Sequence, residues 1–162
     1  MSVNRERPHI WVLPEDDANR QLANGFHLQV EWGAQRQMQV LPEAGGWREV
    51  LALFRSEHIS GMDRYPTRFM VLLFDLDGRI DRLHESRDDI PVHLRDRVFI
   101  LGSLTEPEAM KAAGLGSYEK IGSELAKDCR EGTEQTWDHE LLRHNADELE
   151  RLRARVRPIL FS

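Results

Sequence analysis

The chain has 162 residues, with 28 acidic and 22 basic side chains and a formal net charge of −6. This length suits one ordinary domain with its own core, and the acidic balance argues against indiscriminate nucleic-acid binding, which needs a basic surface. A single cysteine, Cys129, excludes a disulfide framework and fits a reducing compartment.

The first half of the chain predicts three strands separated by helices. An apolar run over residues 8–14 leads into an acidic cluster and a helix over 18–26, because acidic residues are favoured in a helix's first turn. Residues 37–41 predict a second strand, and 47–58 a helix with apolar residues at helical spacing. Arg68 and the six apolar residues 69–74 predict a third, buried strand.

The second half continues the alternation. Residues 79–89 are polar and predict either a helix or an irregular surface segment, and 97–102 predict a fourth apolar strand. A helix begins near Pro107, which is tolerated in a first turn, and another covers 118–130. The leucine-rich residues 137–160 predict a long amphipathic helix.

Strands that alternate with helices indicate β-α-β units with right-handed crossovers. We therefore expect an α/β fold, a three-layer sandwich with a mainly parallel four-stranded sheet and a long C-terminal helix. No repeat or linker divides the sequence, so a single domain over residues 1–162 is predicted. The leucine stripe of the last helix should pack on this domain, with a homodimer as the alternative.

The third strand ends in two aspartates one residue apart, Asp75 and Asp77, followed by Gly78. Side chains alternate along a strand, so both carboxylates should point to the same side. Ligands of open α/β sheets bind beyond the carboxyl ends of the strands. Two carboxylates there suit Mg²⁺ or Mn²⁺, or a nucleophile with its acid/base partner. A helix N-cap is the simpler alternative, but it explains only one of the acids.

Glu15 follows the first strand in the same way. If the first and third strands are neighbours, three carboxylates converge, and their repulsion costs several kcal/mol unless a cation or a proton relieves it. The sequence therefore predicts a metal site formed by Glu15, Asp75 and Asp77. Further candidate ligands or supporting groups are Asp16, Asp17 and Glu108.

This pattern resembles the Toprim domain of topoisomerases, primases and overcoming-lysogenization-defect nucleases. In that family Mg²⁺ lies between a strand-end glutamate and an Asp-x-Asp pair, which correspond here to Glu15 and to Asp75 and Asp77. The resemblance covers about residues 8–125, and the helical segment at 137–160 lies outside it. It implies metal-dependent phosphodiester chemistry on nucleic acid, with the glutamate as general acid/base.

Nucleases of this family also use a lysine after the core strands, a role that the resemblance gives to Lys120, with Lys111 and Lys127 as alternatives. The sequence departs from the family pattern around the glutamate, because Pro14 precedes it and Asp16 takes the place of the usual glycine.

The expected partners follow from the same resemblance. Stand-alone domains of this kind resemble small bacterial proteins encoded near ATPases, which suggests a partner ATPase beside a nucleic acid. The arginine-rich last helix could contact a phosphate backbone, although such a face is more often solvated. No apolar run reaches transmembrane length and the first residues lack a signal-peptide core, so a cytoplasmic protein without membrane contact is expected.

Two other functions compete with this one. The segment around Asp75 also resembles the first motif of haloacid-dehalogenase-type phosphatases, in which Asp75 would be the nucleophile and Asp77 the acid/base. Arg79 stands where that family has threonine, and two strands precede the motif. The remaining alternative is a non-catalytic interaction module that keeps the fold.

Overall fold

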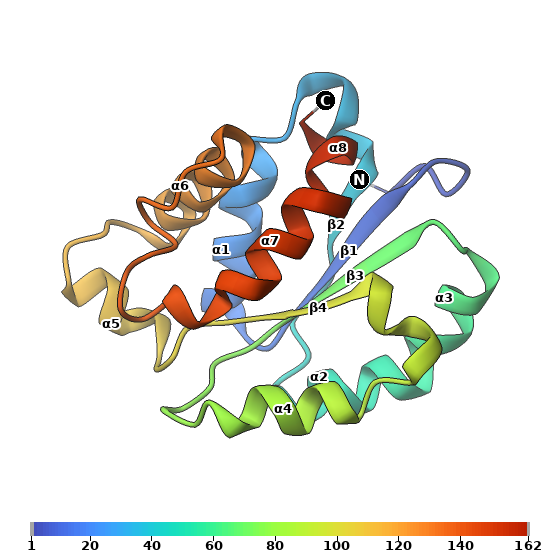
Figure 1. Ribbon diagram of the computed structural model, residues 1–162, viewed down its shortest axis with the longest axis horizontal. Coiled ribbons are helices and arrows are strands. Elements are labelled where there is room, and N and C mark those ends of the chain that lie inside the picture. The colour runs from blue at the N-terminus through green and yellow to red at the C-terminus, as the bar shows by residue number, and fades with distance from the viewer. Residues whose placement is uncertain (1, 162) are drawn as a thin grey trace.

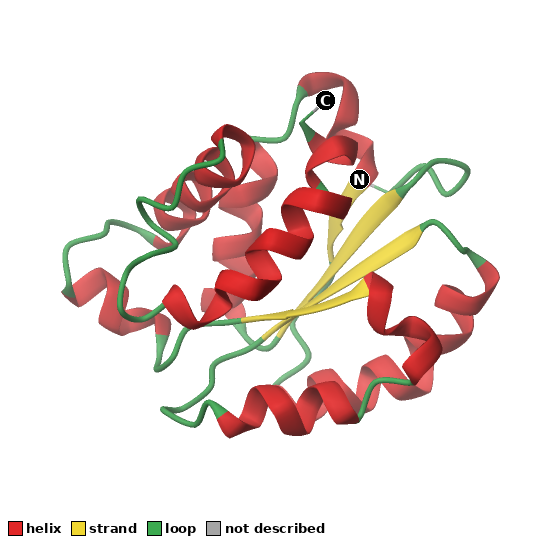
Figure 2. Cartoon of the chain, in the orientation of Figure 1, coloured by secondary structure: helices red, strands yellow, loops and turns green. Residues whose placement is uncertain are grey.

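The computed structural model describes residues 2–161 and is built around one sheet of parallel strands (Figures 1 and 2). The strand order is β2-β1-β3-β4, which makes β1 and β3 central neighbours. This confirms the predicted α/β class and the four-stranded parallel sheet. The strands are β1 (His9–Pro14), β2 (Met38–Val40), β3 (Arg68–Leu73) and β4 (Val98–Leu101).

The helices follow the strands in the expected alternation. The polar segment after β3, for which the sequence left two readings, is helical as α4. The α-helices are α1 (Asp17–Leu28), α2 (Trp47–Leu53), α3 (Ile59–Arg64), α4 (Asp81–Asp88), α5 (Pro107–Ala112), α6 (Tyr118–Glu131), α7 (Ala146–Arg155) and α8 (Arg157–Leu160). A π-helical turn, η2 (Phe54–His58), joins α2 to α3, and 3₁₀ segments are η1 (Trp32–Gln37), η3 (Val92–Arg97) and η4 (Arg143–Asn145).

Two similar units make up the sheet, although the sequence shows no repeat. A helix, a 3₁₀ segment and an outer strand follow each central strand, as β1-α1-η1-β2 and as β3-α4-η3-β4. The two units run outward to opposite edges, so the chain reverses direction between β1 and β3. This is the topological switch point at which open α/β sheets bind ligands.

Helices pack on both faces of the sheet (Figure 1). Alternate strand residues face opposite sides, so Val12 and Val71 pack against α1, α6, α7 and α8, whereas Leu13 and Leu72 pack against α2, α3 and α4. The C-terminal leucine stripe belongs to the first of these cores, as expected for packing on its own domain.

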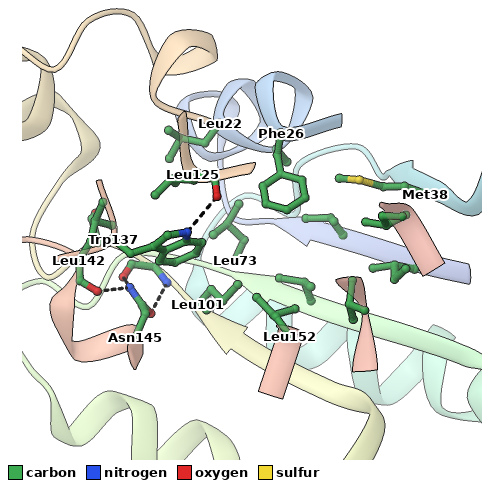
Figure 3. Close-up of a pocket in the computed structure, with 18 residues that line it drawn as sticks. Leu22, Phe26, Met38, Leu73, Leu101, Leu125, Trp137, Leu142, Asn145 and Leu152 are labelled. Atoms are coloured by element: carbon green, nitrogen blue, oxygen red, sulfur yellow. Dashed lines mark hydrogen bonds between the residues drawn. The ribbon is translucent and has the colours of Figure 1, made fainter. Parts of the chain in front are cut away.

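An apolar cavity of about 80 Å³ lies inside that first core (Figure 3). Two polar side chains at one end are fully engaged, because Trp137 Nε1 donates to the Leu125 carbonyl and Asn145 bonds the carbonyls of Leu142 and Gly102. The remaining lining is almost entirely hydrocarbon. The cavity therefore has no free polar group for chemistry, and the candidate site lies at its border, at the strand ends.

The long C-terminal helix expected over 137–160 is not found as one element. The Asp128 carboxylate accepts the backbone N–H groups of Thr136 and Trp137, which holds this stretch in turns, and helix α7 begins only at Ala146. Pro158 lacks a backbone N–H and lies in the first turn of the separate helix α8. The hydrogen bonds to Asp128 and the proline thus divide the segment that the leucine periodicity predicted as one helix.

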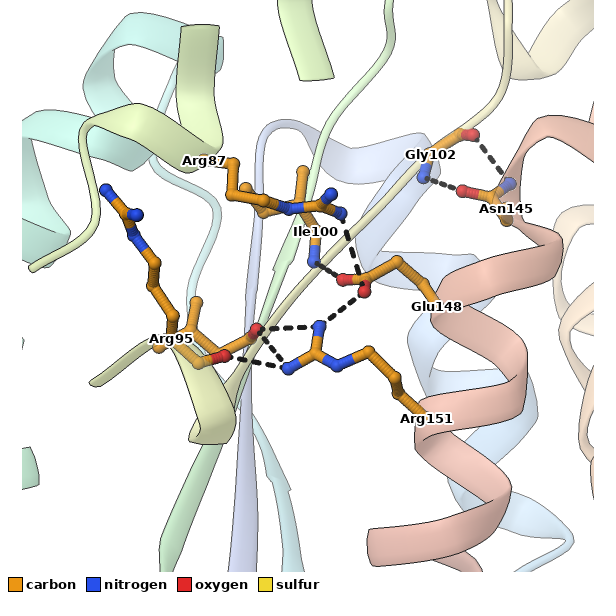
Figure 4. Close-up of polar contacts among 8 residues, drawn as sticks. Arg87, Arg95, Ile100, Gly102, Asn145, Glu148 and Arg151 are labelled. Atoms are coloured by element: carbon orange, nitrogen blue, oxygen red, sulfur yellow. Dashed lines mark hydrogen bonds and ion pairs between the residues drawn. The ribbon is translucent and has the colours of Figure 1, made fainter. Parts of the chain in front are cut away.

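Helix α7 covers the exposed edge of β4 with polar side chains (Figure 4). Asn145 bonds both backbone groups of Gly102, and the Glu148 carboxylate accepts the Ile100 N–H at 2.8 Å. Arg151 donates to the carbonyls of Arg95 and Val98. Side chains three residues apart on one helix therefore replace a neighbouring strand and protect the edge from pairing with other chains.

Glu148 is the most deeply buried acid in this contact, at 4% exposure. Besides the Ile100 N–H it pairs with Arg151 and, at 3.5 Å, with Arg87. A buried carboxylate is tolerated because two cations and a backbone donor surround it.

Replacing Glu148 with alanine leaves the buried Ile100 N–H without an acceptor. We expect the free energy of unfolding to fall by about 1–3 kcal/mol, the cost of an unsatisfied buried donor. Urea denaturation measures this, with the exposed Glu150→Ala as a control that changes stability by less than about 0.5 kcal/mol. Equal midpoints for the two variants would contradict the role given to Glu148.

Candidate functional site

The strand pairing of β1 with β3 brings two of the predicted acids together. Glu15 and Asp75 each follow the end of a central strand, and the backbone N–H of Glu15 donates to the Leu73 carbonyl at 2.8 Å. The Asp75 N–H in turn donates to Glu15 Oε2 at 2.8 Å. The neighbouring strands that the sequence argument required are therefore present, and the two carboxyl groups lie at the switch point.

Asp16 joins this pair from the start of α1. It is the N-cap of the helix, and its Oδ1 accepts both the backbone N–H and the side-chain N–H of Asn19, each at 2.9 Å. The same Asn19 Nδ2 donates to Asp75 Oδ1 at 3.1 Å. One buried amide thus ties the helix N-terminus to the end of β3.

Glu15, Asp16 and Asp75 each offer a carboxylate oxygen within 4.8 Å of the others. Ligands at about 2.1–2.4 Å from one cation lie up to about 4–5 Å apart, so this spacing suits a shared divalent ion. Asn19 Oδ1 is buried beside them and has no hydrogen-bond partner among the described residues. An orphaned oxygen and three carboxylates form a donor set that fits a hard cation.

Asp77, the third predicted ligand, lies apart from this cluster. Its backbone has a φ of 51°, a left-handed conformation that aspartate tolerates, and its side chain is 58% exposed. The buried Arg82 holds it there, donating to Asp77 Oδ2 at 3.2 Å and to the Asp75 carbonyl at 2.9 Å. The strand ends before Asp77, so the alternation that would align it with Asp75 no longer applies.

The remaining sequence candidates are also outside the cluster. Lys120 is exposed on α6, and its ammonium group makes no hydrogen bond or ion pair among the described residues. Lys127 pairs with Glu124, and Lys111 lies over the Tyr118 ring. Further acids placed on the surface are Asp17, which pairs with Arg20, and Glu108. No lysine therefore faces the acids in the described residues.

Three supporting residues were not assigned to a metal site from the sequence. Asn19 and Arg82 lie in helices with no motif around them, and only their folded positions connect them to the acids. Ser103 follows β4, and its single hydroxyl proton is shared between the Thr105 carbonyl and, at 3.4 Å, Asp75 Oδ1. Its position just after β4, a third strand end, was the one sequence feature that could have placed it near the acids.

The electrostatics of the site favour a proton on Asp75. Burial raises the pKa of Asp75 to about 7, with smaller contributions from the charges of Glu15, Asp16 and Asp77, while the Asn19 hydrogen bond lowers it. Burial also raises the pKa of Glu15, against the hydrogen bond from the Asp75 N–H. The cluster thus holds a proton or attracts a cation, as like charges in a buried site must.

Two arginines near the C-terminus bind other groups of the protein itself. Arg153 donates to the carbonyls of Asp128 and Thr133 and pairs with Glu134, and Arg151 belongs to the β4 edge contact. A contact between this segment and a phosphate backbone would therefore have to come from its other arginines.

Comparisons with known proteins add no further information on the site. No family model matches the chain, and neither the curated proteins nor the solved structures include a match. Within residues 2–161, no helix combines the length and apolar character needed to cross a bilayer.

The raised pKa of Asp75 predicts how stability depends on pH without metal. Between its unfolded value of 3.8 and its folded value of about 7, the native state holds the proton more tightly, so stability falls as pH rises. Relative to Asp75→Asn, the wild type should lose up to about 1.4 kcal/mol of unfolding free energy per pH unit in this window.

Urea titrations of both proteins at pH 4 to 8, in a metal chelator, measure this difference. Parallel pH profiles would show instead that Asp75 ionises like a solvated carboxyl group.

Proposed function

We propose that this protein binds Mg²⁺ or Mn²⁺ through Glu15, Asp16 and Asp75 and catalyses phosphodiester chemistry on a nucleic acid. The observation that carries the proposal is the meeting of three carboxylate oxygens within 4.8 Å at the switch point of the sheet. Helices on both faces and acids at the ends of β1 and β3 support a Toprim-like arrangement. Asp16 takes the third ligand position that the sequence gave to Asp77.

A bound divalent cation would neutralise the carboxylates and polarise a phosphate ester. The chain's own residues orient this centre: Asn19 holds Asp16 and Asp75 together, and the Asp75 N–H fixes the Glu15 carboxylate. Glu15 is half-buried and has a raised pKa, which suits the acid/base role that the family resemblance implies.

A substrate would enter from the side of Asp77. A shallow hollow beside it is lined by Asp77, Thr105, Glu106 and Ala109, and Asp77 itself is exposed. This opening is acidic, so a phosphate would need cations to approach it. With an overall charge of −6, the protein would gain affinity for a nucleic acid from a partner such as an ATPase.

A phosphatase is the second candidate, and the Ser103–Asp75 contact favours it. At 3.4 Å the Ser103 hydroxyl lies where it could hold a phosphate transferred to an aspartate nucleophile. Asp75 is only 7% exposed, however, and both hydrogen bonds to its side chain converge on Oδ1. Hydrolysis of a simple phosphomonoester with no phosphodiester cleavage would favour this candidate.

The metal site predicts a specific pattern in calorimetric titrations with Mn²⁺ and Mg²⁺. The wild type should bind one ion, and Asp75→Asn or Glu15→Gln should weaken binding by at least about tenfold, because each removes a charged ligand. Asp77→Asn is the matched control and should keep the wild-type affinity to within about threefold. Equal losses in all three variants would show only a general effect of negative charge.

Activity is the separate test of the reaction. We expect Mn²⁺-dependent cleavage of DNA or RNA that is lost in Asp75→Asn and Glu15→Gln, assayed on single- and double-stranded substrates with and without ATP-dependent partners. Metal binding without any cleavage would support the non-catalytic interaction module instead.

A further inference from the structure

The opposite end of the sheet holds a buried cation that no acid among residues 2–161 neutralises. Arg68 begins β3 beside His9, the first residue of β1, and is 3% exposed. Among the described residues it makes no ion pair with a carboxylate. A buried charge without a counter-charge is costly, and buried charges in proteins are nearly always paired or bound to an ion.

The guanidinium of Arg68 is held by aromatic and neutral groups. Its carbon lies 3.6 Å from the centre of the Trp11 ring and 4.7 Å from that of Tyr65. Its Nε donates to His9 Nε2 at 3.0 Å, and His9 Nδ1 bonds the Arg7 carbonyl at 2.8 Å. Both ring nitrogens are thus engaged, with Nε2 as an acceptor, so His9 is neutral and supplies no compensating charge.

Arg68 and the rings of Trp11, Tyr65 and His9 form a stack, and two buried donors in it have no hydrogen-bond partner among the described residues. Arg68 Nη2 and Trp11 Nε1 are both inaccessible and form no hydrogen bond among the described residues. Unsatisfied buried donors are rare in native proteins and commonly indicate a missing water or ion. Both belong to the same stack, so acceptor oxygens bound there would satisfy them.

The outer side of the stack is also positively charged. Arg5 is exposed, and its guanidinium lies 5.9 Å from the Trp11 ring centre and 5.5 Å from the Tyr65 ring centre. Burial lowers the pKa of Arg68 to about 10, and Arg5 adds to this effect. Two arginine guanidinium groups therefore lie against the same two aromatic rings, and a bound anion would offset the positive charge of both.

The segment from η2 to Gly61 lies close to Arg68 and Trp11. The π-helical turn η2 ends at His58, whose ring stands edge-on to Trp11 at 5.8 Å, and such turns occur frequently at functional sites. A Cβ on Gly61 would lie 2.8 Å from Arg68 Nη1, so the guanidinium would have to shift to admit a larger residue there. These features are independent of the charge argument and lie against the same side chain.

We propose that Arg68, Arg5 and Trp11 form a binding site for a small oxyanion, a phosphate or carboxylate group, at the end of the sheet opposite the acids. Arginine forks and an indole N–H match the acceptor oxygens of such groups. Arg5 is exposed and would turn to close over the ligand. The site does not depend on the proposed metal chemistry, since it shares no residue with it.

The test is a titration with inorganic phosphate against sodium chloride at equal ionic strength. Thermal unfolding and the indole N–H signal of Trp11, assigned with Trp11→Phe, are followed together. We expect a saturable, phosphate-specific rise in Tm and a shift of the Trp11 signal. Acetate in the same titration distinguishes a carboxylate from a phosphate ligand.

Arg68→Met keeps the length of the side chain and removes its charge, and should weaken phosphate binding by at least about tenfold. Arg36→Gln is the matched control, because it removes an exposed arginine outside the stack, and it should bind as the wild type does. If Arg68→Met does not fold, the exposed Arg5→Gln must show the weakening. Absence of saturable binding of both anions to the wild type, or unchanged affinity in Arg68→Met and Arg5→Gln, overturns the proposal.

Discussion

The parallel pairing of β1 with β3 is the constraint on which the rest of the structure depends. Its register runs from His9 beside Arg68 to Pro14 beside Leu73, so each end of the pair brings together residues about 60 positions apart in the chain. Beyond the carboxyl end lie the acids Glu15, Asp16 and Asp75, whose carboxylate oxygens come within 4.8 Å of one another. At the amino end the same register sets a neutral histidine against a buried arginine.

The two ends differ in how their charges are compensated. The acids are stabilised by hydrogen-bond donors of the protein, since Asn19 donates to two of them and the Asp75 N–H donates to Glu15. Within the described part of the chain, the Arg68 guanidinium contacts ring faces and one neutral acceptor only. Cation–π contacts offset part of the desolvation of a guanidinium but do not replace an anion. The proposed cation site and the proposed anion site therefore lie at opposite ends of a single sheet.

The outer edge of β4 is subject to a separate constraint. An outer strand exposes backbone groups that can pair with other chains, and α7 covers those of β4 with the side chains of Asn145, Glu148 and Arg151. The same segment supplies the leucines that complete one core. This explains why the C-terminal segment is divided into turns and short helices: its polar residues must follow the strand edge while its apolar residues fill the space above the sheet.

The sequence by itself determined the four strands and their order along the chain, and it located Glu15 and Asp75 at strand ends, whereas it joined residues 137–160 into one helix. These properties depend on local periodicity, which a linear pattern carries. Only the tertiary structure decided which acids meet. Asp77 lies outside the cluster because the strand ends before it and the buried Arg82 holds its carboxylate, while Asp16 belongs to the cluster because it caps α1 beside the switch point. Asn19 and the unpaired Arg68 were likewise invisible in the sequence, because a hydrogen bond across 56 residues and a missing counter-charge are properties of packing in space.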